Sequence, residues 1–142
     1  RLSNMILNLK LGQKVRFLGD LSDEEVVAHL HASDVFCMPS HLRSEAFGLS
    51  QVEAMSCGLP VVSTNIKTGV PFVNQDGVTG YTVNPGDPHE LSKHINKLFE
   101  DDILRKSMGE AAMERVVSRF DYRVMGKHVM DVYDNVLKRV RK

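Results

Sequence analysis

The chain has 142 residues, of which 42% are hydrophobic and 25% are charged. This balance predicts one folded domain and excludes a disordered chain. Eighteen basic residues match eighteen acidic ones, so the basic excess of a nucleic-acid-binding protein is absent and no nucleic-acid partner is expected. Cys37 and Cys57 form no CxxC pair, and the sequence contains neither an apolar run of about 20 residues nor a signal-peptide pattern. We therefore expect a cytoplasmic protein.

The N-terminal third alternates helical and strand patterns. A helix is expected over 2–11, with Gly12 as its stop, and a short strand over 15–18. Ser22 and Glu25 form a capping box that opens the next helix, whose Val26, Val27 and Leu30 are expected to face inward. The apolar run 35–38, stopped by a proline, predicts a strand buried on both faces.

The rest of the chain continues the alternation. A helix is expected over 49–57 with Gly58 just beyond it, then strands over 60–63 and 81–83. Asp87 and Pro88 begin a further helix well, as N-cap and first helical residue. Two more helices are expected over 103–118 and 122–140, the last strongly amphipathic.

This order of elements predicts an α/β fold: a Rossmann-like parallel sheet with flanking helices. Only four strands are visible, whereas a doubly wound nucleotide-binding unit has about six. Residues 1–142 are therefore interpreted as a single, partial domain that is apparently truncated at its N-terminus.

The stretch 39–62 carries the chemistry. It is a strand, a loop and a helix, so the loop lies beyond the carboxyl end of a parallel strand, where open α/β sheets bind ligands. Phe47, Gly48 and Leu49 offer free main-chain N–H groups at the start of the helix, and such a helix end favours phosphate. Glu45 and Glu53 flank this turn. Because carboxylates repel a diphosphate, we expect them to accept hydrogen bonds from sugar and ribose hydroxyls on either side.

The same stretch reads Glu-x-Phe-Gly-Leu-x-x-x-Glu-Ala-Met-x-x-Gly-x-Pro-Val-Val, and it resembles the signature of retaining GT-B glycosyltransferases of the family 4 type, the glycosyl transferases group 1. Further matches in the same order are found at 15–19, 32–35, 39–40, 77–80, 85–88, Phe120 and Tyr133. The resemblance implies the C-terminal, donor-binding half of a GT-B fold and retaining hexosyl transfer from a nucleoside diphosphate sugar to a hydroxyl acceptor.

Carried over by position, the resemblance implies that Glu45, Phe47, Gly48 and Leu49 bind the donor sugar or the diphosphate. It implies that Glu53 holds the ribose and that Pro39 and Ser40 shape the nucleotide wall. No metal ion or other cofactor is implied, because the helix end and basic side chains neutralise the leaving diphosphate. The family's basic pair and its acceptor-binding N-terminal domain would lie upstream, so this chain alone is expected to bind donor weakly and not to turn over.

Other interpretations remain open from the sequence. A non-catalytic nucleotide-sugar-binding or regulatory module would keep the same fold, and an epimerase or phosphorylase is a third candidate. The Phe47 side chain is better explained by packing than by ligand contact, so only its backbone is a candidate for binding. Cys37 and Cys57 are interpreted as small buried hydrophobic residues and not as nucleophiles. The basic end at 138–142 is typical of a helix terminus, and it also fits peripheral contact with the inner face of an anionic membrane.

Overall fold

The computed structural model describes residues 2–140. Its elements, in chain order, are α1 (Leu2–Asn8), α2 (Asp23–His31), β1 (Phe36–Met38), α3 (Leu49–Ser56), β2 (Val61–Thr64), α4 (Val70–Val73), β3 (Gly80–Val83), α5 (Pro88–Glu100), α6 (Asp102–Arg119) and α7 (Tyr122–Val140). The strands form one parallel sheet in the order β1-β2-β3. The α/β class with a parallel sheet and flanking helices is therefore confirmed.

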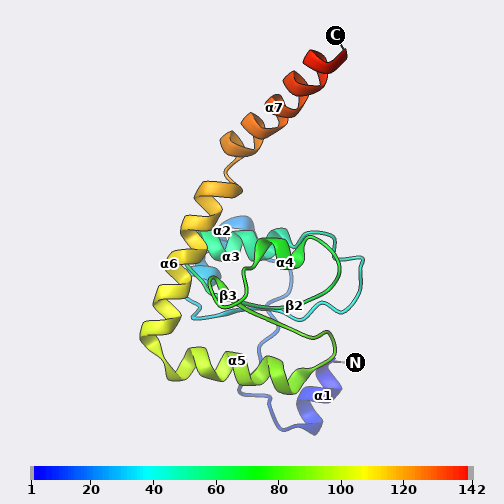
Figure 1. Cartoon of the computed structure of the whole chain (residues 1–142). Coiled ribbons are helices and arrows are strands. Elements are labelled where there is room, and N and C mark those ends of the chain that lie inside the picture. Colours follow the sequence, from blue (N-terminus) through cyan, green and yellow to red (C-terminus); the bar gives the residue numbers. More distant parts are fainter. Residues whose placement is uncertain (1, 141–142) are drawn as a thin grey trace.

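The sheet is covered on both faces (Figure 1). Helices α3 and α4 lie on one side of it, α5 lies on the other, and α6 runs past both and contacts α3 and α5. Consecutive residues of β2 point to opposite faces. Val61 packs with Met55 and Val73 on the α3 side, while Val62 packs with Leu98 in the core beneath α5. All four residues of β2 are buried, as expected for a central parallel strand.

Local signals in the sequence place several helix ends correctly. The Ser22 hydroxyl accepts a hydrogen bond from the Glu25 N–H at 3.3 Å, and the Glu25 carboxylate accepts one from the Ser22 N–H at 2.8 Å. Asp87 caps α5 in the same way, with its Oδ1 2.9 Å from the Glu90 nitrogen. Gly58, just past α3, has φ 78°, the left-handed conformation that glycine adopts at least cost.

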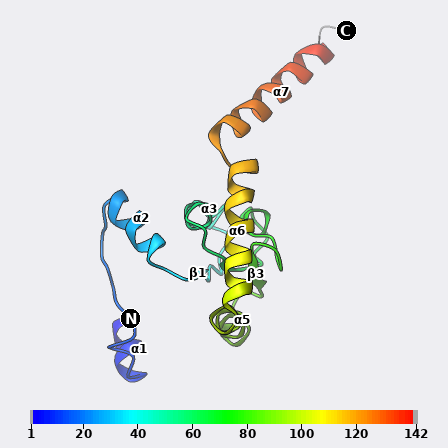
Figure 2. The same ribbon diagram turned by 90° about the vertical axis from the view of Figure 1, so that its left-hand side faces the viewer.

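The prediction of a strand over 15–18 is wrong. This segment is extended, but it pairs with no strand among residues 2–140, and the Phe17 side chain is 59% exposed. A strand requires a hydrogen-bonded neighbour, so an apolar run without one stays irregular. Neither α1 nor α2 contains a buried residue, and Figure 2 shows both helices to one side of the sheet. The prediction that Val26, Val27 and Leu30 face the core is therefore wrong.

The expected burial of β1 is also wrong in part. Cys37 is exposed and Cys57 is half-buried, so neither is a fully buried small hydrophobic residue. The reason for Cys37 is its place in the sheet, because β1 is an edge strand among the described residues and pairs with β2 alone. Helix α4 was not predicted; it lies within the loop between β2 and β3.

Helix α7 extends away from the rest of the molecule (Figures 1 and 2). It is amphipathic as predicted, and its apolar residues Met125, Val129 and Tyr133 are at least half exposed. Lys138 and Arg139 lie in its last turn, whereas the remaining basic residues of the chain end, 141 and 142, lie outside the described residues. None of the helices within residues 2–140 is long and apolar enough to cross a membrane.

Candidate functional site

The carboxyl ends of the three strands lie at one edge of the sheet, at Met38, Thr64 and Val83. The loop from Pro39 to Gly48 leaves this edge and leads into α3. It is anchored near its start, where the Thr64 hydroxyl at the end of β2 donates a hydrogen bond to the Ser40 carbonyl. The predicted site residues therefore lie on the loop and first turns that follow a buried edge of the sheet.

The backbone conformation of the turn before α3 favours a glycine at position 48. Gly48 is the N-cap residue and adopts φ 82° and ψ 59°, a left-handed conformation. An added Cβ would lie 2.8 Å from the Met38 Cε and 2.8 Å from the Gln51 Nε2, so a larger residue would displace these two side chains in addition to straining the backbone. Gly48 itself is buried, whereas the Leu49 side chain is 67% exposed. The accessible end of the turn is therefore at Leu49 and Ser50, in the first turn of α3.

The N–H groups of Leu49 and Ser50 have no backbone or side-chain acceptor among the described residues. These donors are the orphan groups that every helix start leaves, and they carry the positive end of the helix dipole. Phe47 was predicted, like Gly48 and Leu49, to offer its main-chain N–H group. Its side chain has a separate role, because the Phe47 ring packs edge-on against the Phe120 ring, with 5.9 Å between centroids. The Phe47 side chain is thus a packing anchor, as one sequence interpretation held.

Glu45 lies on one side of this turn. It is half-buried and lines a hollow of about 260 Å³ together with Ser40, His41, Leu42 and Ser44. Ser40 and Glu45, both predicted site residues, are therefore brought together. The lining is polar, with a carboxylate, a histidine ring and two hydroxyls, which suits a ligand rich in hydroxyl groups.

Glu53 lies on the other side, one turn into α3, and is exposed. It lines a second hollow, of about 280 Å³, between α3 and α2. The α3 wall adds Ser56 and Cys57, and the α2 wall consists of Asp23, Val26, Val27 and Leu30. The apolar residues of α2 that were expected in the core therefore face this hollow instead.

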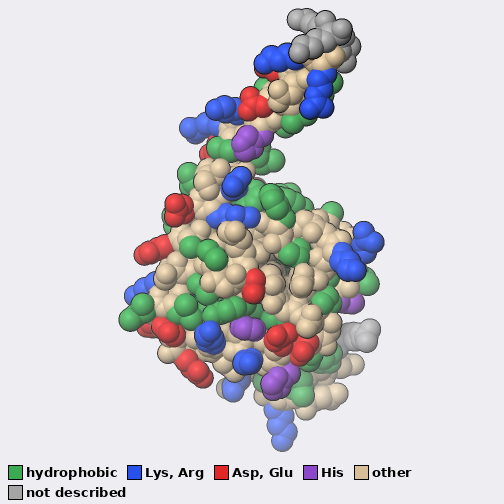
Figure 3. All heavy atoms as spheres, viewed as in Figure 1, with side chains coloured by type: hydrophobic (Ala, Val, Ile, Leu, Met, Phe, Trp, Pro, Cys, Tyr) green, Lys and Arg blue, Asp and Glu red, His purple; other side chains and the backbone are tan. Residues whose placement is uncertain are grey.

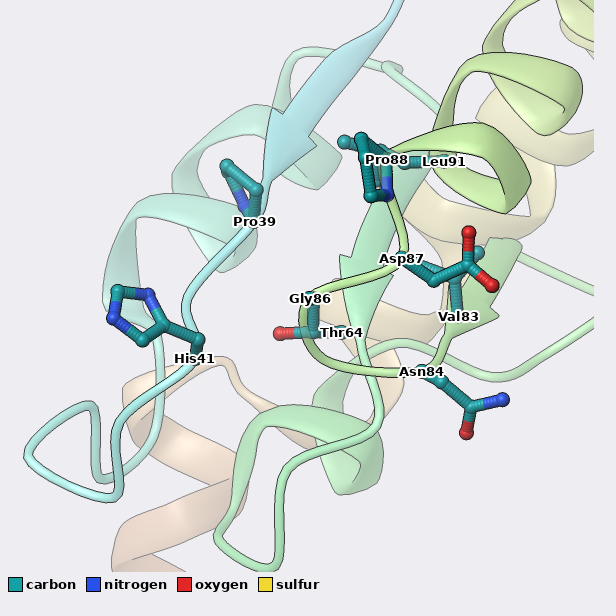
Figure 4. Close-up of a pocket in the computed structure, with 9 residues that line it drawn as sticks. All are labelled: Pro39, His41, Thr64, Val83, Asn84, Gly86, Asp87, Pro88 and Leu91. Carbon is teal, nitrogen blue, oxygen red and sulfur yellow. The ribbon is translucent and has the colours of Figure 1, made fainter.

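Pro39 lines a third hollow, of about 160 Å³, at the carboxyl edge of the sheet (Figure 4). Pro88, at the start of α5, lies across it, and Thr64 forms its floor between the two loops. His41 lines both this hollow and that of Glu45. Pro39 thus lines a different hollow from Glu53, although both residues were predicted to contact one nucleotide.

Two features of this region were not predicted from the sequence, namely the α2 wall and one residue beneath the turn. The signal for the α2 wall was present, because Val26, Val27 and Leu30 form an apolar helix face that needs something to cover it. The other missed residue is Gln51, which is fully buried although its side chain is polar. The face of the molecule seen in Figure 3 mixes acidic, basic and hydrophobic side chains, in keeping with a net charge of zero.

Comparisons with known proteins identify the family. The family model described as Glycosyl transferases group 1 matches residues 1–115. A phosphatidyl-myo-inositol mannosyltransferase of Mycobacterium leprae is 35% identical over 126 residues, which cover 89% of this chain and 33% of that protein. The chain thus spans about a third of the length of this curated relative.

Solved structures with the same fold also match this chain. Sucrose-phosphate synthase from Thermosynechococcus elongatus matches with a TM-score of 0.86 and 27% identity, over 98% of this chain and 34% of that one. HepE from Anabaena, solved in complex with UDP, matches with a TM-score of 0.86 and 30% identity over 94% of this chain and 36% of that one. HepE has also been solved with UDP-glucose.

Proposed function

Because the chain belongs to the glycosyl transferases group 1 family, we propose that it is the nucleotide-sugar-binding part of a retaining hexosyltransferase of the family 4 type. The observation that carries the proposal is the arrangement around the start of α3. Two glutamates, each in its own hollow, lie on either side of a helix end whose N–H groups have no acceptor among the described residues. A nucleoside diphosphate sugar has the matching order of ribose, diphosphate and hexose.

We assign the nucleoside to the hollow between α2 and α3. The Glu53 carboxylate accepts hydrogen bonds from the ribose hydroxyls, and the apolar wall of Val26, Val27 and Leu30 covers the flat face of the base. This assignment gives the exposed apolar face of α2 a ligand to cover. The similarity to HepE, which was solved in complex with UDP, supports nucleotide binding by this chain.

We assign the hexose to the hollow of Glu45, where the carboxylate and the Ser40 and Ser44 hydroxyls can bind sugar hydroxyls. The diphosphate then lies against the first turn of α3, at Leu49 and Ser50. The helix end stabilises the charge that the leaving diphosphate acquires, so the proposed reaction requires no metal ion. Further positive charge and the acceptor site belong to an N-terminal domain, which the proposed enzyme needs for turnover.

The proposal is tested by titrating the chain with UDP, GDP and ADP and with their hexose conjugates. We expect at least one nucleoside diphosphate to bind, and Glu53→Ala to weaken it by about tenfold, equivalent to 1.4 kcal/mol. Glu45→Ala should lower the affinity for the sugar conjugate and leave that for the diphosphate alone unchanged. Glu24→Ala, an exposed glutamate on α2 that does not line the hollow, is the matched control. Failure of every nucleotide to bind the folded wild-type chain would refute the proposal.

A further inference from the structure

Gln51 is a polar side chain buried at a position where an apolar one would be expected. It lies in α3 and is 0% exposed. Its Nε2 donates two hydrogen bonds, to the Phe47 carbonyl at 3.1 Å and to the Val70 carbonyl at 3.1 Å. Its Oε1 is buried and has no partner among the described residues. A buried amide with an unpaired oxygen is costly, so the two bonds of the nitrogen must account for its presence.

The first of these bonds fixes the turn before α3. The Gln51 side chain binds the Phe47 carbonyl, and the Gln51 backbone N–H binds the Gly48 carbonyl at 3.0 Å. The C=O and N–H of a trans peptide point in opposite directions. Holding these two carbonyls therefore also fixes the directions of the Gly48 and Leu49 N–H groups. One residue thus sets the orientation of the backbone at the start of the helix.

The second bond connects the turn to the segment after β2. Gln51 Nε2 reaches Val70, and the neighbouring Gly69 N–H donates to the Ala46 carbonyl at 2.7 Å. The two segments are so close that a Cβ on Gly69 would lie 2.8 Å from the Phe47 ring and 2.9 Å from the Ala46 oxygen. The turn is therefore bound to a second segment and cannot change its orientation independently.

That second segment is itself held by α6. The Arg115 guanidinium donates to the Val73 carbonyl at 2.8 Å and also to the Phe72 carbonyl, and it lies over the Phe72 and Phe120 rings. Burial, followed by the nearby Arg119 charge, lowers the pKa of Arg115, but a guanidinium keeps its charge at neutral pH. The support of the turn thus continues from Gln51 through Val70 to α6.

We propose that Gln51 is a positioning residue, which orients the N–H groups at the start of α3 toward the diphosphate of the donor. This inference rests on the proposed function. Gln51 does not itself touch the ligand, since its side chain is buried beneath the turn. Its effect is on the diphosphate part of the ligand and not on the nucleoside, whose hollow is formed by Glu53 and α2.

The experiment measures how Gln51→Met changes binding of a nucleoside diphosphate and of the same nucleoside without phosphate. Methionine has a similar length but cannot donate a hydrogen bond. UDP, GDP and ADP, each with its nucleoside, are titrated into the 142-residue chain and followed by NMR, which also detects weak binding. We expect the diphosphate affinity to fall by about tenfold and the nucleoside affinity to stay within about twofold.

The controls separate positioning from general destabilisation. Leu98→Ala removes a fully buried side chain from the core beneath α5, in a cluster that contains no residue of the turn or of α4, so it should lower stability without changing the ratio of the two affinities. Gly69→Ala disturbs the bridge from its other side and keeps the inference testable if Gln51→Met does not fold. Equal losses for both ligands, or an unchanged diphosphate affinity, would overturn the role of Gln51 while leaving the proposed function intact. Wild-type chain that binds no nucleotide would overturn both.

Discussion

Arg115 offers the sharpest test of how the segment after β2 is supported. The perturbation is Arg115→Met, which keeps much of the apolar stem and removes the guanidinium. Three hydrogen bonds are lost, to the carbonyls of Val73 and Phe72 and to the Gln75 side chain at 3.1 Å. The change therefore releases the C-terminal end of a short helix, α4, that has only four residues.

The magnitude follows from these contacts. A hydrogen bond to a charged group contributes about 1.5–3 kcal/mol when buried. Only the bond to Val73 is partly shielded from water, and the other two lie at the exposed rim, where water replaces much of the lost interaction. We therefore expect a total loss of about 2–3 kcal/mol in the free energy of unfolding. For a chain of this size, that loss corresponds to a decrease in Tm of about 8 °C.

The assay is equilibrium unfolding in urea, followed by circular dichroism, with Arg119→Met as the matched control. Arg119 lies one turn further along α6, is exposed and makes no hydrogen bond or ion pair through its side chain among the described residues. Its replacement should change stability by less than about 0.5 kcal/mol. If Arg115→Met and Arg119→Met had the same midpoint of urea unfolding, the hydrogen bonds of Arg115 would contribute nothing measurable to stability and the reasoning would be wrong.

Two further predictions concern the sheet and α2. Gly80→Ala should prevent folding, because its Cβ would lie against the Val61 carbonyl in the neighbouring strand. Gly86→Ala has open space around it and should cost only about 1–2 kcal/mol, because of its positive φ. Equal stability of the two variants in urea unfolding would contradict the steric argument. Ser22→Ala removes the capping box and should cost α2 about 1 kcal/mol. Because α2 has no buried residue, the loss should appear as faster amide hydrogen exchange within α2, with the global unfolding midpoint unchanged. A shift of that midpoint would contradict the prediction.

The parts of the fold that were predictable depend on short-range chemistry. Ser22 with Glu25, and Asp87 with Glu90, are pairs three residues apart whose hydrogen bonds form within one helical turn. Their sequence pattern is therefore sufficient to place a helix start. The buried strand β2 was also predictable, since two valines follow Pro60, and a proline is tolerated at the first position of a strand.

The parts that failed depend on what lies far away in the sequence. Residues 15–18 have the composition of a strand, but a strand also needs a neighbour, which composition does not reveal. Helix α4 is held by Gln51, nineteen residues before Val70, and by Arg115, forty-two residues after Val73. No local sequence pattern indicates such contacts, so neither α4 nor its contacts with Gln51 and Arg115 were predicted.

At the candidate site the start of the helix was predictable, whereas the hollows that the surrounding residues line were not. The sequence placed Glu45 before a helix and Glu53 within it, and α3 does begin between them, at Leu49. It did not indicate that each faces a separate hollow, or that Pro39 faces a third one. Those details depend on α2 and on the loop before α5, which approach from other parts of the chain.

The free edge of β1 has a practical consequence for every measurement on this chain. Within residues 2–140 the strand is paired on one side only, and Cys37 is exposed there. An open row of backbone donors and acceptors is a template onto which a second chain can add a strand. Concentrated samples are therefore prone to associate through this edge, and an oxidised thiol would make such pairs permanent. Titrations belong at low protein concentration with a reductant present.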